Sequence, residues 1–130
     1  MKALRILGLV LVLAAAITSC KKDNVSKGNK AAEGMWVGKW GDGSEDPSYY
    51  YRLELKPGGT LNRYDDENNV IATGTWTVNG IEFIGQYTMT HNGFKASVKG
   101  LYHDIVGEIT GTWGETPSYA NGGTFDLKKQ

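Results

Sequence analysis

The side chains that could act as acids, bases or metal ligands are scattered through this sequence rather than grouped. His91 and His103 each fall in a short polar stretch that is typical of a solvated turn. The acidic run at 65–67 is typical of an exposed loop. Residues 42–46 place oxygen-bearing side chains at alternate positions, as a calcium loop does, but lack the later glycine and bidentate glutamate. We therefore expect no metal site and no cofactor.

Catalytic and nucleic-acid-binding signatures are also missing. There is no Gly-x-Ser-x-Gly, no His-Glu-x-x-His and no glycine-rich phosphate loop. The formal net charge of the whole chain is zero, and no basic patch of the kind that binds nucleic acid is evident. The sequence therefore predicts a protein that is not an enzyme and does not bind nucleic acid.

Aromatic side chains are the remaining candidates for a binding site. Gly-x-Trp occurs three times, at 38–40, 74–76 and 111–113, and three consecutive tyrosines at 49–51 follow a loop rich in Gly, Asp and Pro. Loops at the mouth of a barrel commonly carry ligand sites. Core or rim packing is the alternative role for each of these rings. The candidate ligand-contacting residues are Trp40, Tyr49, Tyr51, Trp76, Phe83, Tyr87 and Trp113.

Strands must position these rings, because the dominant pattern is alternation of apolar and polar residues. In 81–89, for example, Ile81, Phe83, Gly85, Tyr87 and Met89 share one face. Asn79-Gly80 and Asn92-Gly93 favour hairpin turns, since both pairs tolerate positive φ. The predicted strands are 35–41, 49–56, 59–64, 70–78, 81–90, 93–101, 105–113 and 123–129.

Short turns between these strands favour antiparallel neighbours. Each strand has one apolar face and the sequence offers almost no helix to cover it, so the sheet is expected to close on itself. We therefore predict an all-β, eight-stranded, up-and-down (meander) barrel, with a two-sheet sandwich as the competing architecture. Gly-x-Trp then falls on strands one, four and seven. Three steps in a meander reverse the strand direction, so shared geometry explains the motif better than duplication does.

The N-terminus is set apart from the strands by its composition. Lys2 and Arg5 precede an unbroken apolar run, Ile6–Ile17, which is shorter than the about 20 residues of a membrane-spanning helix. This arrangement predicts a secretory signal peptide. Ile17-Thr18-Ser19-Cys20 resembles the lipobox of bacterial lipoproteins, which implies removal of residues 1–19 and acylation of Cys20. Three acyl chains would suffice for stable anchoring to a membrane.

The residues after Cys20 predict the location and the domain boundary. Lys21 stands where an aspartate would resemble the inner-membrane retention signal of some Gram-negative bacteria, so the expected address is the cell envelope, at the outer membrane, on its periplasmic face or at the cell surface. Residues 20–34 are polar and without a periodic apolar face. They are expected to form a flexible tether from the lipidated cysteine to one domain, 35–130.

Gly38-Lys39-Trp40 on the first strand of such a meander resembles the lipocalins and their calycin relatives. The resemblance implies that Trp40 closes one end of the barrel, and the short strands imply a small cavity. We therefore expect a membrane-anchored, lipocalin-like lipoprotein that binds a small apolar or amphipathic ligand. The alternative is a protein-binding module with a filled barrel, such as a periplasmic inhibitor or an envelope-assembly lipoprotein. An interior below roughly 100 Å³ would favour the alternative, because small-molecule pockets measure about 300–1,000 Å³.

Overall fold

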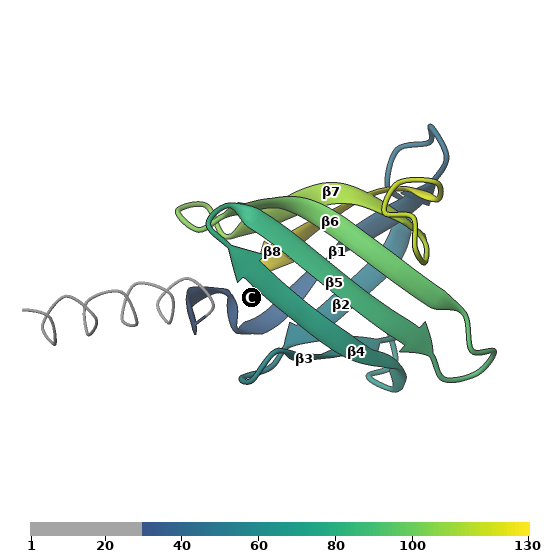
Figure 1. Ribbon diagram of the computed structural model, residues 1–130, viewed down its shortest axis with the longest axis horizontal. Coiled ribbons are helices and arrows are strands. Elements are labelled where there is room, and N and C mark those ends of the chain that lie inside the picture. The colour runs from purple at the N-terminus through teal and green to yellow at the C-terminus, as the bar shows by residue number, and fades with distance from the viewer. Residues whose placement is uncertain (1–29) are drawn as a thin grey trace, which may run out of the picture.

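Eight strands follow one another along residues 30–130, the part of the chain that the computed structural model describes (Figure 1). Each strand pairs antiparallel with the next, and β1 pairs with β8, which closes the barrel. This order confirms the predicted meander barrel. The signal peptide, Cys20 and tether residues 20–29 lie outside the described residues. The strands are β1 (Gly34–Asp42), β2 (Tyr49–Leu55), β3 (Thr60–Tyr64), β4 (Val70–Asn79), β5 (Glu82–Met89), β6 (Lys95–His103), β7 (Glu108–Glu115) and β8 (Gly123–Lys129).

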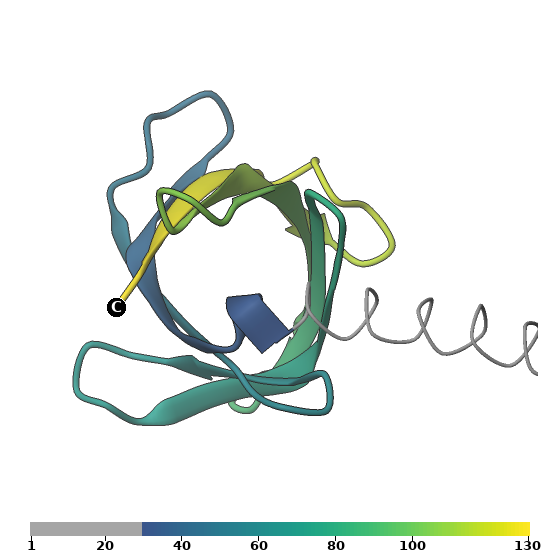
Figure 2. The same cartoon turned by 90° about the vertical axis from the view of Figure 1, so that its left-hand side faces the viewer.

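The two ends of the barrel differ. At one end lie the turns 56–59, 80–81 and 104–107, together with a helical turn at 30–32 that lies across the opening in Figure 2. We call this the plugged end. At the other, the open end, lie the connections 43–48, 65–69, 90–94 and 116–122. Among residues 30–130, no helix has the length and apolar character needed to cross a bilayer.

The plugged end is sealed by Trp36 and the helical turn. Trp36 is fully buried, and its indole N–H donates a hydrogen bond of 2.9 Å to the carbonyl oxygen of Ala32, which is itself fully buried. The ring of Trp36 meets that of Tyr102 edge to face, with centroids 6.1 Å apart. Residues 30–34, which we expected to belong to the tether, are therefore part of the fold, because a tertiary contact with the barrel orders them.

The Gly-x-Trp motif has one geometric cause at all three positions. The copies on β1 and β7 run toward the open end and the copy on β4 runs toward the plugged end, as a meander requires. A Cβ on Gly38, Gly74 or Gly111 would collide with a backbone carbonyl oxygen of the adjacent strand, at Asp126, Gln86 and Lys99 respectively. Glycine thus permits a close approach of two strand backbones, and tryptophan two residues later fills the interior.

Two parts of the predicted alternation were wrong. Ile105 was assigned to the inner face of a strand beginning at 105, but it lies in an exposed turn with 94% of its surface accessible, and β7 begins at Glu108. Ile81 was assigned to the inner face of β5, but it precedes that strand and is exposed. Apolar residues in these turns continue the period-two pattern of the neighbouring strand, so the pattern alone does not mark where the strand begins.

Gly74→Ala should destabilise the barrel by about 2 kcal/mol or more, because the new methyl group must displace the β5 backbone at Gln86. The free energy of unfolding from urea denaturation measures this loss. Thr75→Ala, at an exposed position on the same strand, is the matched control and should cost less than about 1 kcal/mol. Equal losses in the two variants would contradict a steric role for Gly74.

Candidate functional site

A cavity of about 240 Å³ occupies the open half of the barrel. Its residues come from six strands and one loop, and all except Asn92 of the β5–β6 loop lie on strands or directly beside one. The volume exceeds the limit of roughly 100 Å³ below which the ligand hypothesis would fail, and is smaller than a drug-sized pocket. The lining residues are Trp40, Tyr51, Arg63, Tyr87, Met89, Asn92, Phe94, Ala96 and Trp113.

Two tryptophans form one wall of the cavity near its opening. The rings of Trp40 and Trp113 meet edge to face with their centroids 5.3 Å apart. The indole N–H of Trp113 donates to the carbonyl oxygen of Gly41 at 2.9 Å, which fixes the ring against β1. The ring of Tyr49, the partner of Trp40 across β1 and β2, lies tilted against the Trp40 ring with centroids 4.7 Å apart. These contacts hold two large apolar surfaces in place around a space that protein atoms do not fill.

A polar cluster of Arg63, Tyr51 and Tyr87 lies deeper in the barrel. The hydroxyl groups of Tyr51 and Tyr87 are 3.1 Å apart and share a hydrogen bond. Arg63 donates from Nη1 to the Tyr87 hydroxyl at 3.2 Å, and its guanidinium lies 5.0 Å from the centroid of Tyr51 and 5.6 Å from that of Tyr87. Both tyrosines are almost fully buried, so the cluster forms the polar bottom of a cavity whose opening is apolar.

The charge of Arg63 has no carboxylate partner. Across residues 30–130, no Asp or Glu oxygen lies within 4 Å of its guanidinium, and Nε is buried without a hydrogen-bond partner. A buried N–H left unpaired costs about 1–3 kcal/mol. The tyrosine rings compensate the guanidinium only through cation–π contact, which is weaker than a buried ion pair. The cavity thus carries one positive charge that the described protein does not neutralise.

Burial raises the pKa of the Tyr51 hydroxyl well above its ordinary value of 10. A charged Tyr87 nearby would raise the pKa further, the positive charge of Arg63 acts in the opposite direction, and the hydrogen bond with Tyr87 raises it again. Tyr51 therefore remains a neutral phenol at physiological pH and does not neutralise Arg63.

The structure brings together four of the residues predicted from the sequence. Trp40, Tyr51, Tyr87 and Trp113 line the cavity. The lipocalin resemblance implied that Trp40 closes one end of the barrel, but Trp40 lines the cavity instead. Trp36 closes the plugged end, because the helical turn at 30–32 covers that end.

The other three predicted residues do not line the cavity. Tyr49 is 50% exposed at the start of β2, where it packs against Trp40 of the neighbouring strand. Trp76 and Phe83 are buried near the plugged end, where the indole N–H of Trp76 donates to the carbonyl oxygen of Lys56 at 3.0 Å. All three were predicted at the site because alternation gave them an inward face. Trp76 and Phe83 lie at the plugged end because β4 runs toward that end and β5 begins there.

Arg63 is the main site residue that sequence reasoning missed. A signal was present: Arg63 stands two residues after Leu61 on a short strand, so both must point inward if Leu61 does. A charged residue is not expected inside a small barrel, and this position was assigned only to a strand. Met89, Asn92, Phe94 and Ala96 complete the lining, and all four were expected on an inner face or in a turn but not at a site.

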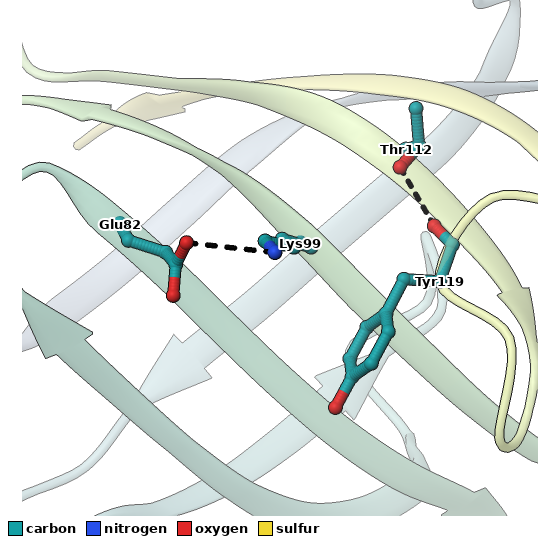
Figure 3. A network of polar contacts seen from close by, with 4 residues as sticks. All are labelled: Glu82, Lys99, Thr112 and Tyr119. Atoms are coloured by element: carbon teal, nitrogen blue, oxygen red, sulfur yellow. Dashed lines mark hydrogen bonds and ion pairs between the residues drawn. The ribbon is translucent and has the colours of Figure 1, made fainter.

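A second hollow lies on the outer wall, over β5, β6 and β7, and includes Lys99. Lys99 pairs with Glu82 at 3.5 Å, and the nearby Thr112 hydroxyl donates to the carbonyl oxygen of Tyr119 at 2.6 Å, where the β7–β8 loop folds back over the wall (Figure 3). Its volume is larger, about 410 Å³, but it opens broadly to solvent and its one cation is already paired. The inner cavity is therefore the stronger candidate site.

Comparison with protein families, curated proteins and solved structures gives no match for this chain. Within residues 30–130, no group of three or more His, Cys, Asp and Glu side chains is arranged to hold a metal ion. The inner cavity is therefore the feature of this chain that bears most directly on function.

The raised pKa of Tyr51 should make the barrel less stable in alkali. Above about pH 10 the phenol of Tyr51 ionises in the unfolded chain but stays protonated in the folded one, so rising pH favours unfolding. Urea denaturation at a series of pH values, combined with phenolate absorbance, measures this. Tyr51→Phe should reduce the alkaline loss, whereas Tyr50→Phe, exposed on the same strand, should leave it unchanged. An identical alkaline loss in Tyr51→Phe and the unaltered protein would contradict the assignment.

Proposed function

We propose that this protein is a membrane-anchored, lipocalin-like binding protein that holds a small amphipathic molecule in the cavity at the open end of its barrel. The observation that carries the proposal is the unfilled, aromatic-lined space of about 240 Å³ above a buried polar cluster. A barrel that served only as a scaffold would gain stability by filling this space, since voids forfeit packing energy. Lining by rings with a few convergent polar groups is typical of small-molecule sites.

The size of the cavity limits the ligand. A volume of 240 Å³ corresponds to about eight water molecules at roughly 30 Å³ each. An extended lipid chain would not fit inside, whereas a molecule with one ring or a short branched chain would. The proposed ligand therefore has about eight to ten non-hydrogen atoms within the barrel.

Lipidation of Cys20 would set the orientation of the site. The described chain begins with residues 30–32 at the plugged end, and a linker of about ten residues spans at most roughly 35 Å. An acylated Cys20 would hold the plugged end toward the membrane and leave the open end facing away from it. We propose the outer membrane of a Gram-negative cell as the location, from the resemblance of residues 17–21 to lipoprotein signals.

A protein-binding module is the second candidate function, and one observation favours it. Four large apolar side chains are exposed at the plugged end or just beside it, in the turns 80–81 and 104–107 and at the end of β6. Such a cluster is more typical of a contact surface than of a free one. The four residues are Ile81, Leu101, Ile105 and Val106.

Native mass spectrometry of the full protein, gently extracted, distinguishes the two functions. We expect a small molecule bound one to one. We expect Trp113→Phe to lose it, because the smaller ring removes part of the apolar wall that Trp113 and Trp40 form. Trp76→Phe is the matched control: it also removes an indole hydrogen bond to a carbonyl oxygen, but at the plugged end. A stoichiometric protein partner with no small molecule would instead support the second function.

Cys20→Ala should leave the protein uncleaved or free of the membrane, because the acyl chains that anchor it are attached to this residue. Membrane fractionation and the mass of the N-terminal peptide measure both effects. Ser19→Ala keeps a small residue before the cysteine and should be processed and anchored normally. Unchanged fractionation and processing of Cys20→Ala would rule out lipidation.

A further inference from the structure

We infer that the molecule held in this cavity is a small carboxylic acid whose carboxylate group pairs with Arg63. The inference rests on the proposed function and adds the chemical class of the ligand. The charge, the hydrogen-bonding capacity and the shape of the cavity each support it.

The charge of the cavity favours an anionic guest. Arg63 is the only charged residue among those that line the cavity. No carboxylate of residues 30–130 pairs with it, whereas Lys99 on the outer wall forms an ion pair with Glu82 at 3.5 Å. An unpaired guanidinium with a buried Nε is costly, and an anion is the guest that removes most of this cost. One cation with no second positive charge nearby is matched by a monoanion rather than by a dianion.

The hydrogen-bonding capacity of the polar cluster favours an acceptor as the guest. Tyr51 and Tyr87 have one hydroxyl hydrogen each, and one of these two hydrogens is used in the bond between them. The N–H of Arg63 donates to the Tyr87 oxygen, so this bond occupies a lone pair of that oxygen and uses neither hydroxyl hydrogen. No described residue accepts the remaining hydroxyl hydrogen. The cluster therefore offers a guanidinium and one phenolic hydrogen to the same guest, and both are donors that favour an oxygen anion.

The shape of the cavity favours a small apolar body on the guest. Trp40, Trp113, Phe94 and Met89 surround the space between the polar cluster and the opening. They favour an apolar body attached to the acid group, and the volume of about 240 Å³ limits this body to one ring or a short branched chain. An aromatic or branched aliphatic carboxylate fits both requirements.

Phenylacetate and its neutral isostere phenylacetamide test the inference on the unaltered full protein. Quenching of tryptophan fluorescence at neutral pH reports binding, because two tryptophans line the cavity. We expect phenylacetate to bind at least about tenfold more tightly than phenylacetamide, the difference typical of a hydrogen bond to a charged group. Equal affinities would overturn the carboxylate assignment and leave the proposed function standing.

Arginine variants test whether Arg63 causes the preference for phenylacetate over phenylacetamide. Arg63→Gln should bring the two affinities to within about twofold, chiefly by weakening phenylacetate. Arg52→Gln is the matched control, since Arg52 also lies over a tyrosine ring, at 4.8 Å from Tyr64, but on the outer face of β2. A preference that survives Arg63→Gln, or disappears in Arg52→Gln, would overturn the role of Arg63. Arg63→Lys keeps the charge and should retain part of the preference if Arg63→Gln fails to fold.

The remaining outcomes separate the two proposals. If neither probe binds but native mass spectrometry finds a neutral small molecule, the carboxylate inference is wrong and the binding function stands. If neither probe binds and no small molecule is retained, both are wrong.

Discussion

The pairing of β1 with β8 is the contact on which every other feature of this barrel depends. It runs from Trp36 opposite Lys129 to Asp42 opposite Gly123 and joins the two ends of the described chain. The backbones approach so closely that a Cβ on Gly38 or on Gly123 would collide with a carbonyl oxygen of the partner strand. Without this pairing, both strands would present open edges and the apolar faces of the sheet would need another cover. Closure turns those faces into an interior, and the interior can then be divided into a core and a cavity.

The two halves of the interior are filled in different ways. Toward the plugged end, buried leucine, phenylalanine and tryptophan side chains form the core, and the backbone at Ala32 completes the seal over Trp36. Toward the open end, Arg63 and two tyrosines occupy the position where further apolar residues would stabilise a simple core. A guanidinium there is stabilised by ring contacts, one hydroxyl group and the sulfur of Met89 rather than by a carboxylate. The arrangement at this end is therefore less stable than a fully apolar core would be.

Strand alternation was sufficient to predict the closed meander, because short turns and one apolar face per strand leave few other ways to cover the sheet. It was less reliable for the site. Trp40, Tyr51, Tyr87 and Trp113 meet at the cavity, whereas Trp76 and Phe83, with the same inward orientation, belong to the other end. Alternation specifies the face of a residue but not its height along the barrel axis. Height depends on strand direction and register, which the pairing of neighbouring strands decides.

By itself, the sequence determined the number and order of the strands, the inward face of most of them and the glycine–tryptophan steps that let their backbones approach, because these features depend on residues close to one another in the chain. Only the tertiary structure decided that Lys30–Ala32 seals one end, that the other end keeps a cavity, and that Arg63 points into it with no carboxylate beside it. Whether a charge is neutralised depends on side chains from distant strands. Arg63 lies on β3 and the ring system around it comes from β2 and β5, and their meeting is a consequence of closure rather than of any local pattern.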